Sequence, residues 1–279
     1  ATQRTHTIGL VLRTHLDAWA AQILLRIEDL AHESGYQVFV STHRAEADRE
    51  RSALMAFHGR RVEGVIIVSS VLGQDLVALR ELLGIPLVLV SPLVRAPHIY
   101  TVRPQDTEGA QQAVEHLIRL GHRRIAHIAA PEWAAPGHDR VQGYRQALEA
   151  HGIAWDPDLV FEGDAHESGG LEGVQRLLKL PNPPTALFCF NDLTAVGALH
   201  GARLMGLRVP EDLSVVGFDD VPLVKYVVPP LCTVRQEMES LGRRAMLMLL
   251  DLIAGRETQA PVEVGARLVV RESCAPITG

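Results

Sequence analysis

Short apolar runs alternate with longer amphipathic segments along almost the whole chain. The apolar runs are bounded by turn residues and predict strands, whereas apolar positions spaced three and four residues apart predict helices. Strands are expected at residues 6–12, 36–41, 65–68, 87–90, 124–129, 186–190, 213–218 and 231–234. Helices are expected at residues 18–34, 47–61, 75–83, 107–120, 139–151, 168–180, 193–205 and 238–254. Because parallel strands need a crossover, usually a helix, this order predicts an α/β fold with parallel sheets.

Glycines follow several of the predicted helices. Gly35, Gly121, Gly152, Gly206 and Gly255 each stand just past a helix, where a left-handed C-cap suits a residue without a Cβ atom. The strand–helix pattern restarts after Gly121, and the whole set is too long for one core. The sequence therefore predicts two doubly wound parallel-sheet lobes with a cleft between them.

Composition narrows the class of protein. The chain has 279 residues, of which 47% are hydrophobic and 22% charged, as in folded globular proteins. A formal net charge of −6 does not favour nucleic-acid binding by this chain. No apolar run approaches the roughly eighteen residues of a membrane span, and the polar start of the chain lacks a secretory pattern. Three scattered cysteines form neither a disulfide framework nor a metal-ligand pattern. A cytoplasmic protein is expected.

Familiar catalytic and cofactor motifs are missing. The sequence has no phosphate-binding loop, no dinucleotide-binding glycine turn, no zinc-binding H-E-x-x-H helix and no G-x-S-x-G turn. His116 and His122 lie six residues apart, too far for a shared metal without further ligands. A dispersed Ser-His-Asp set could assemble in space, but no feature of the sequence requires one. We therefore predict no catalytic residue, no metal and no cofactor.

Polar residues follow the predicted strands at their carboxyl ends. Asp219 and Asp220 end the run 213–218, and Asn191 and Asp192 follow the run 186–190. Open α/β sheets bind ligands at this edge, which favours a polar binding cleft. The alternative for either acid is a helix N-cap or a turn residue. Further strand ends carry Arg13-Thr14-His15, Ser69-Ser70 and Ser91 in the first lobe, and Pro131-Glu132-Trp133 in the second.

These residue types suit a ligand with hydroxyl groups. Carboxylates accept hydrogen bonds from vicinal hydroxyls, and an amide both donates and accepts. Trp19 or Trp133 could cover the apolar face of a sugar or a base. Arg140, expected to open the helix after the loop 131–138, could reach the same cleft with its planar guanidinium. Its alternative is a solvated helix-start residue, or a partner for Asp139 or Glu132.

Several segments resemble one protein family, in the same order along the chain. They are residues 6–12, 62–67, 84–90, 115–126, 209–220, 229–236 and 269–273. Together they span nearly the whole chain and resemble the effector-binding core of the lactose-repressor and galactose-repressor family of bacterial transcription regulators.

The resemblance implies a periplasmic-binding-protein-like fold of type I, with three crossovers between the lobes. The first lobe would comprise residues 1–120 and about 236–261, and the second residues 121–235 and about 262–279. The resemblance also implies a homodimer with contacts near residues 196–205 and 222–226. The effector in the cleft would control operator binding by a helix-turn-helix headpiece, which is not present before His6.

The resemblance also carries over a set of site residues. Arg140, Asn191 and Asp219 match the positions that grip effector hydroxyls or other polar groups. Trp19 matches an aromatic that lines the pocket, and Asp106 or Glu108 a polar position at a helix start. With Thr14 and Ser69 from the strand ends, these form the predicted ligand-binding set.

Two departures from the family pattern concern the effector. Ala165 follows Gly163-Asp164 where an aromatic is common, and the loop 14–19 lacks the usual Asn-Pro-Phe-Phe pattern. The effector class therefore does not transfer from the family. The leading hypothesis is the sensor core of a repressor-type regulator for a small polar metabolite, most simply a sugar. The alternatives are a periplasmic sugar-binding protein of a transporter, and an enzyme that uses the cleft acids as general acid and base.

Overall fold

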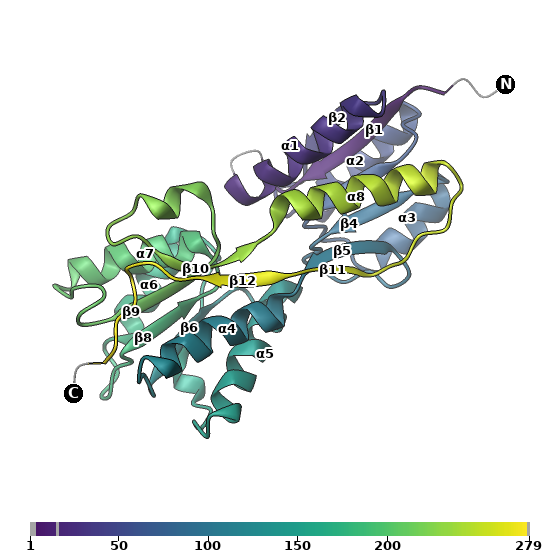
Figure 1. The fold of residues 1–279 in the computed structure, drawn as a ribbon. Helices are drawn as coiled ribbons and strands as arrows, with labels where there is room; N and C mark the ends of the chain where they lie inside the picture. Colours follow the sequence, from purple (N-terminus) through teal and green to yellow (C-terminus); the bar gives the residue numbers. More distant parts are fainter. Residues whose placement is uncertain (1–3, 15–16, 278–279) are drawn as a thin grey trace. The chain divides into compact units, whose positions relative to one another are not determined.

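The chain folds into two compact α/β units. The computed structural model describes residues 4–14 and 17–277 (Figure 1). Unit 1 comprises Ala1–Pro104 and Glu237–Val264, and unit 2 comprises Gln105–Gln236 and Gly265–Gly279. The chain passes between the units after Pro104, after Gln236 and after Val264, which gives the three crossovers implied by the family resemblance.

Unit 1 is built on a six-stranded parallel sheet in the order β11-β5-β4-β3-β1-β2. Its strands are β1 (Thr7–Leu12), β2 (Gln37–Thr42), β3 (Val65–Val68), β4 (Leu87–Val90), β5 (Tyr100–Pro104) and β11 (Val262–Val264). Its helices are α1 (Ala18–Glu33), α2 (Ala47–Gly59), α3 (Asp75–Leu83) and α8 (Met238–Ile253). Helices α1 and α8 pack together on one face, and α2 and α3 cover the other (Figure 1). The central strands β3 and β4 are therefore buried at every residue.

Unit 2 repeats this design with the sheet order β12-β10-β9-β8-β6-β7. Its strands are β6 (Ile125–Ala129), β7 (Val160–Glu162), β8 (Ala186–Cys189), β9 (Ser214–Asp219), β10 (Cys232–Gln236) and β12 (Ala266–Val269). Its α-helices are α4 (Asp106–Arg119), α5 (Ala135–Ala150), α6 (Glu167–Leu177) and α7 (Asp192–Leu204), with 3-10 turns at Pro157–Leu159 and Pro222–Lys225. Helix α4 packs on α5, and α6 packs on α7. Only the edge strand β12 is antiparallel to its neighbour.

The strand order locates a ligand-binding edge in each unit. In unit 1, the second strand β2 lies on one side of β1 and the third strand β3 on the other, so the strand order reverses at β1. In unit 2, β7 and β8 flank β6 in the same way. In open parallel sheets, ligands bind outside the carboxyl ends of the strands at this reversal point. The relevant strand ends are those of β1 and β3 in unit 1, and of β6 and β8 in unit 2.

The predicted helices and strands are confirmed, and residues 65–68, 75–83 and 87–90 have the predicted boundaries. Gly35, Gly121, Gly152, Gly206 and Gly255 all have positive φ, as C-caps require. The sequence analysis missed β5, β7, β11 and β12, which are short and lack a continuous apolar run. Their pairing with a neighbouring strand, and not their own pattern, makes them strands.

Two predicted boundaries are corrected. Helix α5 begins at Ala135 and not at residue 139, because Pro136 fits the first turn of a helix, where its missing N–H is not needed. The first crossover follows Pro104 and not Leu120. Helix α4 belongs to unit 2 because it packs on α5, β10 and β12.

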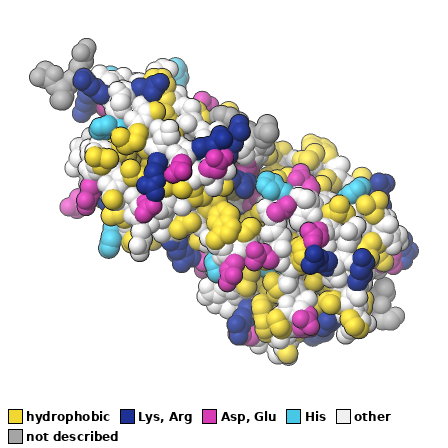
Figure 2. Space-filling model, turned by 180° about the vertical axis from the view of Figure 1, so that it is seen from behind, with side chains coloured by type: hydrophobic (Ala, Val, Ile, Leu, Met, Phe, Trp, Pro, Cys, Tyr) yellow, Lys and Arg dark blue, Asp and Glu magenta, His cyan; other side chains and the backbone are white. Residues whose placement is uncertain are grey.

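The surface carries charges of both signs. On the face seen in Figure 2, Lys and Arg side chains are interspersed with Asp and Glu side chains. Within residues 4–14 and 17–277, no helix combines the length and the apolar character needed to cross a membrane.

Candidate functional site

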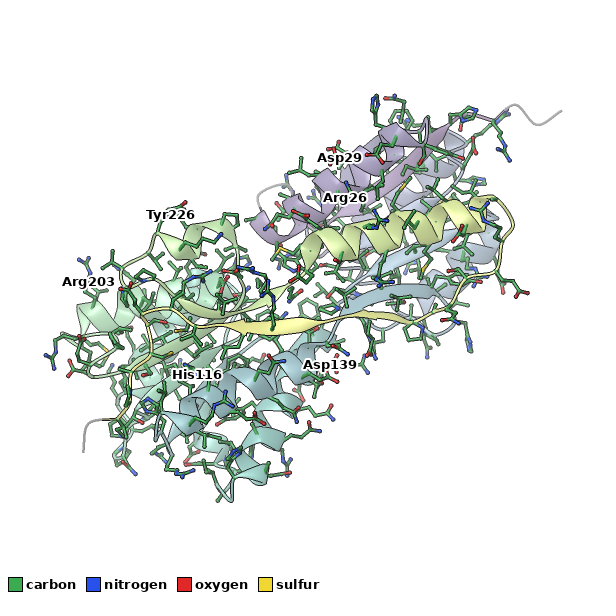
Figure 3. The ribbon with its side chains drawn as sticks, viewed as in Figure 1. Arg26, Asp29, His116, Asp139, Arg203 and Tyr226 are labelled. Carbon is green, nitrogen blue, oxygen red and sulfur yellow. The ribbon has the colours of Figure 1, made fainter. Side chains whose placement is uncertain are left out.

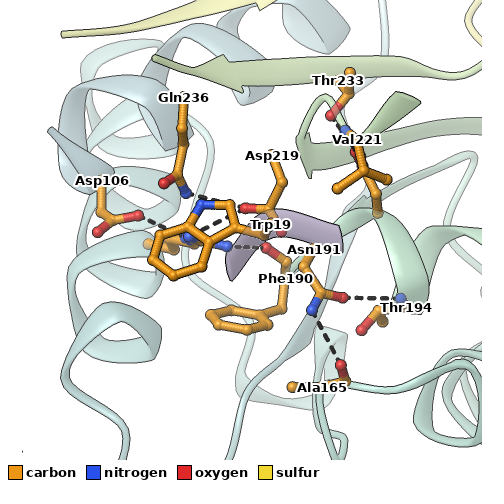
Figure 4. A network of polar contacts seen from close by, with 12 residues as sticks. Trp19, Asp106, Ala165, Phe190, Asn191, Thr194, Asp219, Val221, Thr233 and Gln236 are labelled. Atoms are coloured by element: carbon orange, nitrogen blue, oxygen red, sulfur yellow. Dashed lines mark hydrogen bonds and ion pairs between the residues drawn. The ribbon is translucent and has the colours of Figure 1, made fainter. Parts of the chain in front are cut away.

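Arg140 is the centre of a buried polar network in unit 2. It lies in the second turn of α5, and its side chain is 4% exposed. Its Nε donates a hydrogen bond of 2.8 Å to Oδ1 of Asp106, the first residue of α4. Its NH1 group donates to the backbone carbonyl of Phe190, and NH2 lies 3.6 Å from Oδ1 of Asp219. Figure 4 labels the partners Asp106, Phe190 and Asp219. The guanidinium is thus held by three chain segments that are far apart in the sequence.

Two aromatic rings complete the enclosure of this guanidinium. The Cζ atom of Arg140 lies 3.8 Å from the ring centroid of Phe218 and 4.4 Å from that of Phe190. Both distances allow cation–π attraction, which is strongest where water is excluded. The alternative that Arg140 is a solvated helix-start residue is therefore wrong.

Asp219 ends β9 in a strained backbone conformation. Its φ is 114° and that of Asp220 is 58°, in a region that costs a side-chain-bearing residue about 1–3 kcal/mol. Oδ1 of Asp219 accepts a 3.0 Å hydrogen bond from Nε2 of Gln236, the last residue of β10. The sequence analysis missed Gln236. Its position at the end of the strand next to β9 is the signal that could have identified it.

Asp220 has a different environment from its neighbour. Its side chain is 1% exposed, and its two oxygens lie 2.6 Å from Arg235 and 2.5 Å from Arg271. Both arginines come from strand β10 and the segment after β12, so Asp220 ties the edge of the unit 2 sheet together. Of the two adjacent acids, Asp219 belongs to the Arg140 network and Asp220 to a structural ion-pair cluster.

Asn191 and Asp192 begin α7 and bind backbone groups. Oδ1 of Asn191 accepts from the Thr194 N–H at 2.9 Å, and Nδ2 donates to the Ala165 carbonyl at 3.0 Å. The side chain of Asn191 thus caps α7, a role that the sequence analysis had considered only for the acids. An amide still has a second N–H and a second lone pair, so the predicted contact with an effector stays open. Asp192 accepts from the Val221 N–H and the Thr233 hydroxyl, and burial raises its pKa to about 7.

The remaining predicted residues lie in unit 1. Thr14 follows β1, and Ser69 follows β3 with a φ of 60°. Trp19 lies in the first turn of α1, where its backbone N–H donates a 3.0 Å hydrogen bond to Oδ1 of the N-cap residue Asp17. All three belong to the carboxyl-end side of the unit 1 sheet. His15, named with Thr14 at the same strand end, lies outside the described residues.

The charges of the unit 2 network suggest which ligands it can take. One guanidinium faces two carboxylates, so the formal charge of the Arg140, Asp106 and Asp219 group is −1. Carboxylate oxygens accept several hydrogen bonds each, and a guanidinium has five N–H donors. The network can therefore bind a neutral ligand with hydroxyl groups, whereas its net charge disfavours an anion.

Comparison with known proteins identifies the family. The periplasmic binding protein-like domain family matches residues 114–274. The transcriptional repressor CytR of Escherichia coli K12 is 35% identical over 266 residues, which cover 95% of this chain and 76% of the relative. The transcriptional repressor PurR of Aliivibrio salmonicida is 31% identical over 271 residues, covering 96% of this chain and 81% of the relative.

Solved structures agree with this assignment. A complex of the transcriptional regulator CelR with cellobiose is 36% identical, with a TM-score of 0.87, covering 97% of this chain and 85% of the regulator. The lac repressor dimer bound to operator and the anti-inducer ONPF is 28% identical, with a TM-score of 0.89, covering 99% of this chain and 96% of the repressor. The fold, the sequence and the order of the matched segments lead to one conclusion: this chain belongs to the lactose-repressor family of transcription regulators.

Proposed function

We propose that this chain is the effector-sensing core of a transcriptional repressor and binds a sugar through the Arg140 network of unit 2. Arg140, Asp106 and Asp219 would contact the sugar hydroxyls directly, with Asn191 beside them. Thr14, Ser69 and Trp19 of unit 1 stay predicted effector contacts.

The observation that carries the proposal is the fixed guanidinium at the strand ends. Arg140 is held by two carboxylates, a backbone carbonyl and two aromatic rings, next to the ends of β8 and β9. A preorganised side chain loses little entropy when a ligand binds. Strain at Asp219 and Asp220 supports the same location, because strained residues persist at functional sites.

The sugar class rests on chemistry and on relatives. Acceptor-rich carboxylates beside a guanidinium match the alternating donors and acceptors of vicinal hydroxyls. CelR was solved with cellobiose, and a LacI family regulator from Enterococcus faecium, 26% identical to this chain, was solved with bound ribose. The similarity to repressors over nearly the whole chain favours regulation over transport. We infer binding without turnover, since both network acids are engaged with Arg140.

We further propose that unit 2 pairs with a second copy of the chain. A surface groove of about 570 Å³ is lined by apolar and cationic residues of α7 and of the segments 207–209 and 227–229. Val228 of this lining is 91% exposed, and the nearby Leu223 and Tyr226 are 58% and 80% exposed. Exposed apolar side chains gathered in one place are typical of interaction surfaces, and the lac repressor relative was solved as a dimer.

The test of the effector site is a thermal-shift screen of the purified chain. The panel contains monosaccharides including ribose, disaccharides including cellobiose, sugar phosphates and purine nucleosides. A ligand at a hundred times its Kd should add about 2.7 kcal/mol and raise Tm by several degrees. Asp219→Ala and Arg140→Ala should each weaken the hit by about 1.5–3 kcal/mol, or roughly 10- to 150-fold in Kd.

Control variants come from the same helix. Arg145 and Glu149 form an exposed ion pair on α5, so Arg145→Ala and Glu149→Ala should leave the Kd unchanged. Arg140→Lys keeps the charge and serves as a second variant if Arg140→Ala does not fold. A folded Asp219→Ala protein that binds the hit as tightly as the wild type would refute this site. Product formed from the hit sugar would refute binding without turnover.

A further inference from the structure

A histidine and two cysteines meet in unit 2, away from the Arg140 network. His116 lies in the last turn of α4, Cys232 begins β10, and Cys274 follows β12 in the carboxyl-terminal segment (Figure 3 labels His116). One ring nitrogen of His116 and the two sulfur atoms all lie within 4.8 Å of one another. Across residues 4–14 and 17–277, this is the one group of three such side chains found close enough to share a metal ion.

The histidine of this cluster has an unsatisfied polar atom. Nε2 of His116 is buried and has no hydrogen-bond partner among the described residues. Leaving a polar atom buried without a partner is costly, so such atoms in folded proteins call for an explanation. A ligand that accepts the lone pair of this nitrogen would supply one.

The two sulfur atoms have different hydrogen-bond partners. The Arg271 N–H donates to Sγ of Cys232 at 3.1 Å, which favours a thiolate there. The Cys274 thiol donates to the Val215 carbonyl at 3.3 Å. Thiolate is the form that binds metal ions.

We propose that His116, Cys232 and Cys274 form a binding site for a thiolate-preferring metal ion, Zn²⁺ or Cu⁺. Thiolate and imidazole ligands select these ions over Mg²⁺ and Ca²⁺, which prefer oxygen. On binding, the thiol protons of the cluster pass to solvent as both sulfur atoms become thiolates, and His116 gives the lone pair of its ring nitrogen. Cu⁺ can be held by three such ligands, whereas Zn²⁺ would take a water as its fourth ligand.

The spacing of the three atoms fits this chemistry after a small adjustment. With metal–sulfur and metal–nitrogen bonds of about 2.3 and 2.0 Å, two ligand atoms on a tetrahedral ion lie roughly 3.5–3.8 Å apart. From the observed limit of 4.8 Å, small side-chain rotations that bring the ligand atoms about 1 Å closer together reach this distance. The sequence analysis predicted no metal, because residues 116, 232 and 274 have no motif spacing.

A disulfide between Cys232 and Cys274 is the competing use of the same sulfur atoms. It would leave Nε2 of His116 buried without a partner, whereas a metal ion satisfies all three groups. The buried His116 nitrogen therefore favours a metal ion over a Cys232–Cys274 disulfide.

The test uses the reduced, metal-free protein. Zn²⁺ is titrated in competition with a chromophoric zinc chelator, and Cu⁺ without oxygen in competition with a copper(I) chelator. Co²⁺ serves as a spectroscopic probe, because thiolate ligands give it a sulfur-to-cobalt charge-transfer band. We expect one equivalent of Zn²⁺ or Cu⁺ per chain, and the Co²⁺ band.

Variants assign the ligands. Cys232→Ser, Cys274→Ser and His116→Gln should each weaken binding by at least about tenfold, the lower bound seen for residues that support metal ligands. Cys189→Ala removes the third thiol, which lies in β8 outside the cluster, and should bind as the wild type does. Tm without metal reports whether each variant folds. His116 is partly exposed on α4, so His116→Gln decides the question if a serine variant does not fold.

Three outcomes would overturn the proposal. The first is that the reduced wild type takes up neither ion stoichiometrically. The second is that folded His116→Gln and Cys274→Ser variants bind as tightly as the wild type. The third is a Cys232–Cys274 disulfide in the protein as purified, with no metal bound after its reduction.

Discussion

At the scale of single residues, the environment separates two neighbouring acids of the same type. Asp219 is the last residue of β9 and Asp220 follows it, yet the first joins Arg140 and Gln236 and the second joins Arg235 and Arg271. Both residues have positive φ, so the chain turns at this point and the two adjacent carboxylates meet different partners. One acid can therefore serve a ligand while the next stabilises the sheet edge.

Replacing Asp220 tests this division. Asp220→Ala leaves two arginines of the ion-pair cluster without their carboxylate, and we expect a loss of about 3 kcal/mol in the free energy of unfolding. Urea unfolding measures it. Glu149→Ala on the exposed surface should cost under about 1 kcal/mol and serves as the control. A stability of Asp220→Ala equal to that of the control would show that the cluster contributes nothing.

His127 should make stability depend on pH. It is fully buried in β6, its ring stacks on Phe188 at 4.6 Å, and its Nδ1–H donates a 2.8 Å hydrogen bond to the Phe188 carbonyl. Burial lowers its pKa from 6.5 to about 4. The unfolded chain therefore binds a proton below pH 6.5 that the folded chain binds only near pH 4. Stability from neutral His127 is complete above pH 6.5 and falls as the pH falls toward 4.

A variant isolates this contribution. His127→Gln cannot titrate, so its destabilisation relative to the wild type should be about 2 kcal/mol smaller at pH 5 than at pH 7. Urea unfolding of both proteins at the two pH values gives the difference. Asp192, whose pKa is raised to about 7, shifts stability in the opposite direction, but it is present in both proteins and cancels. A cost that does not change with pH would contradict the prediction.

At the scale of elements, glycines allow two helices of unit 2 to pack backbone to backbone. A Cβ atom on Gly197 of α7 would overlap the Glu167 carbonyl oxygen of α6, and one on Gly170 of α6 would overlap the Thr194 carbonyl oxygen of α7. Asn191 caps α7 and also binds the Ala165 carbonyl just before α6. The close approach of α6 and α7 therefore helps to set the position of Asn191, a predicted site residue.

Gly197→Ala should force these helices apart. We expect a loss of about 1–3 kcal/mol in the free energy of unfolding, the usual cost of overpacking, in spite of alanine's higher helix propensity. Gly59→Ala is the matched control, because this helical glycine of α2 has open space around it and should gain up to about 1 kcal/mol. Thermal and urea unfolding measure both. Equal effects of the two variants would mean that the α6–α7 contact adapts without cost.

At the scale of the whole molecule, both units share one topology but carry different surfaces. Unit 2 exposes Leu223, Tyr226 and Val228 beside the groove on α7, and Arg203 and Tyr226 mark this region in Figure 3. If a second copy covers it, charged substitutions there should break the assembly. Burying an unpaired carboxylate in an apolar contact is strongly unfavourable.

We predict that the wild type sediments as a dimer and that the double variant Tyr226→Asp/Val228→Asp sediments as a monomer. Analytical ultracentrifugation at micromolar concentration distinguishes the two. Leu82→Asp, on the exposed side of α3 in unit 1, is the control and should leave the dimer intact. A monomeric wild type, or a double variant that stays dimeric, would contradict the proposed surface.

The sequence by itself determined the succession of helices and strands, the parallel sheets and the polar residues at strand ends. These features depend on local periodicity, on glycine caps and on the direction of the chain, all of which are encoded within short segments of the sequence. Tertiary structure alone decided that Gln236 binds Asp219, that α4 belongs to unit 2, and that residues 116, 232 and 274 meet. Tertiary structure also decided that the edge segments β7 and β12 form strands. The reason is physical: burial, pairing and charge partners come from residues far apart along the chain, and no local pattern encodes them.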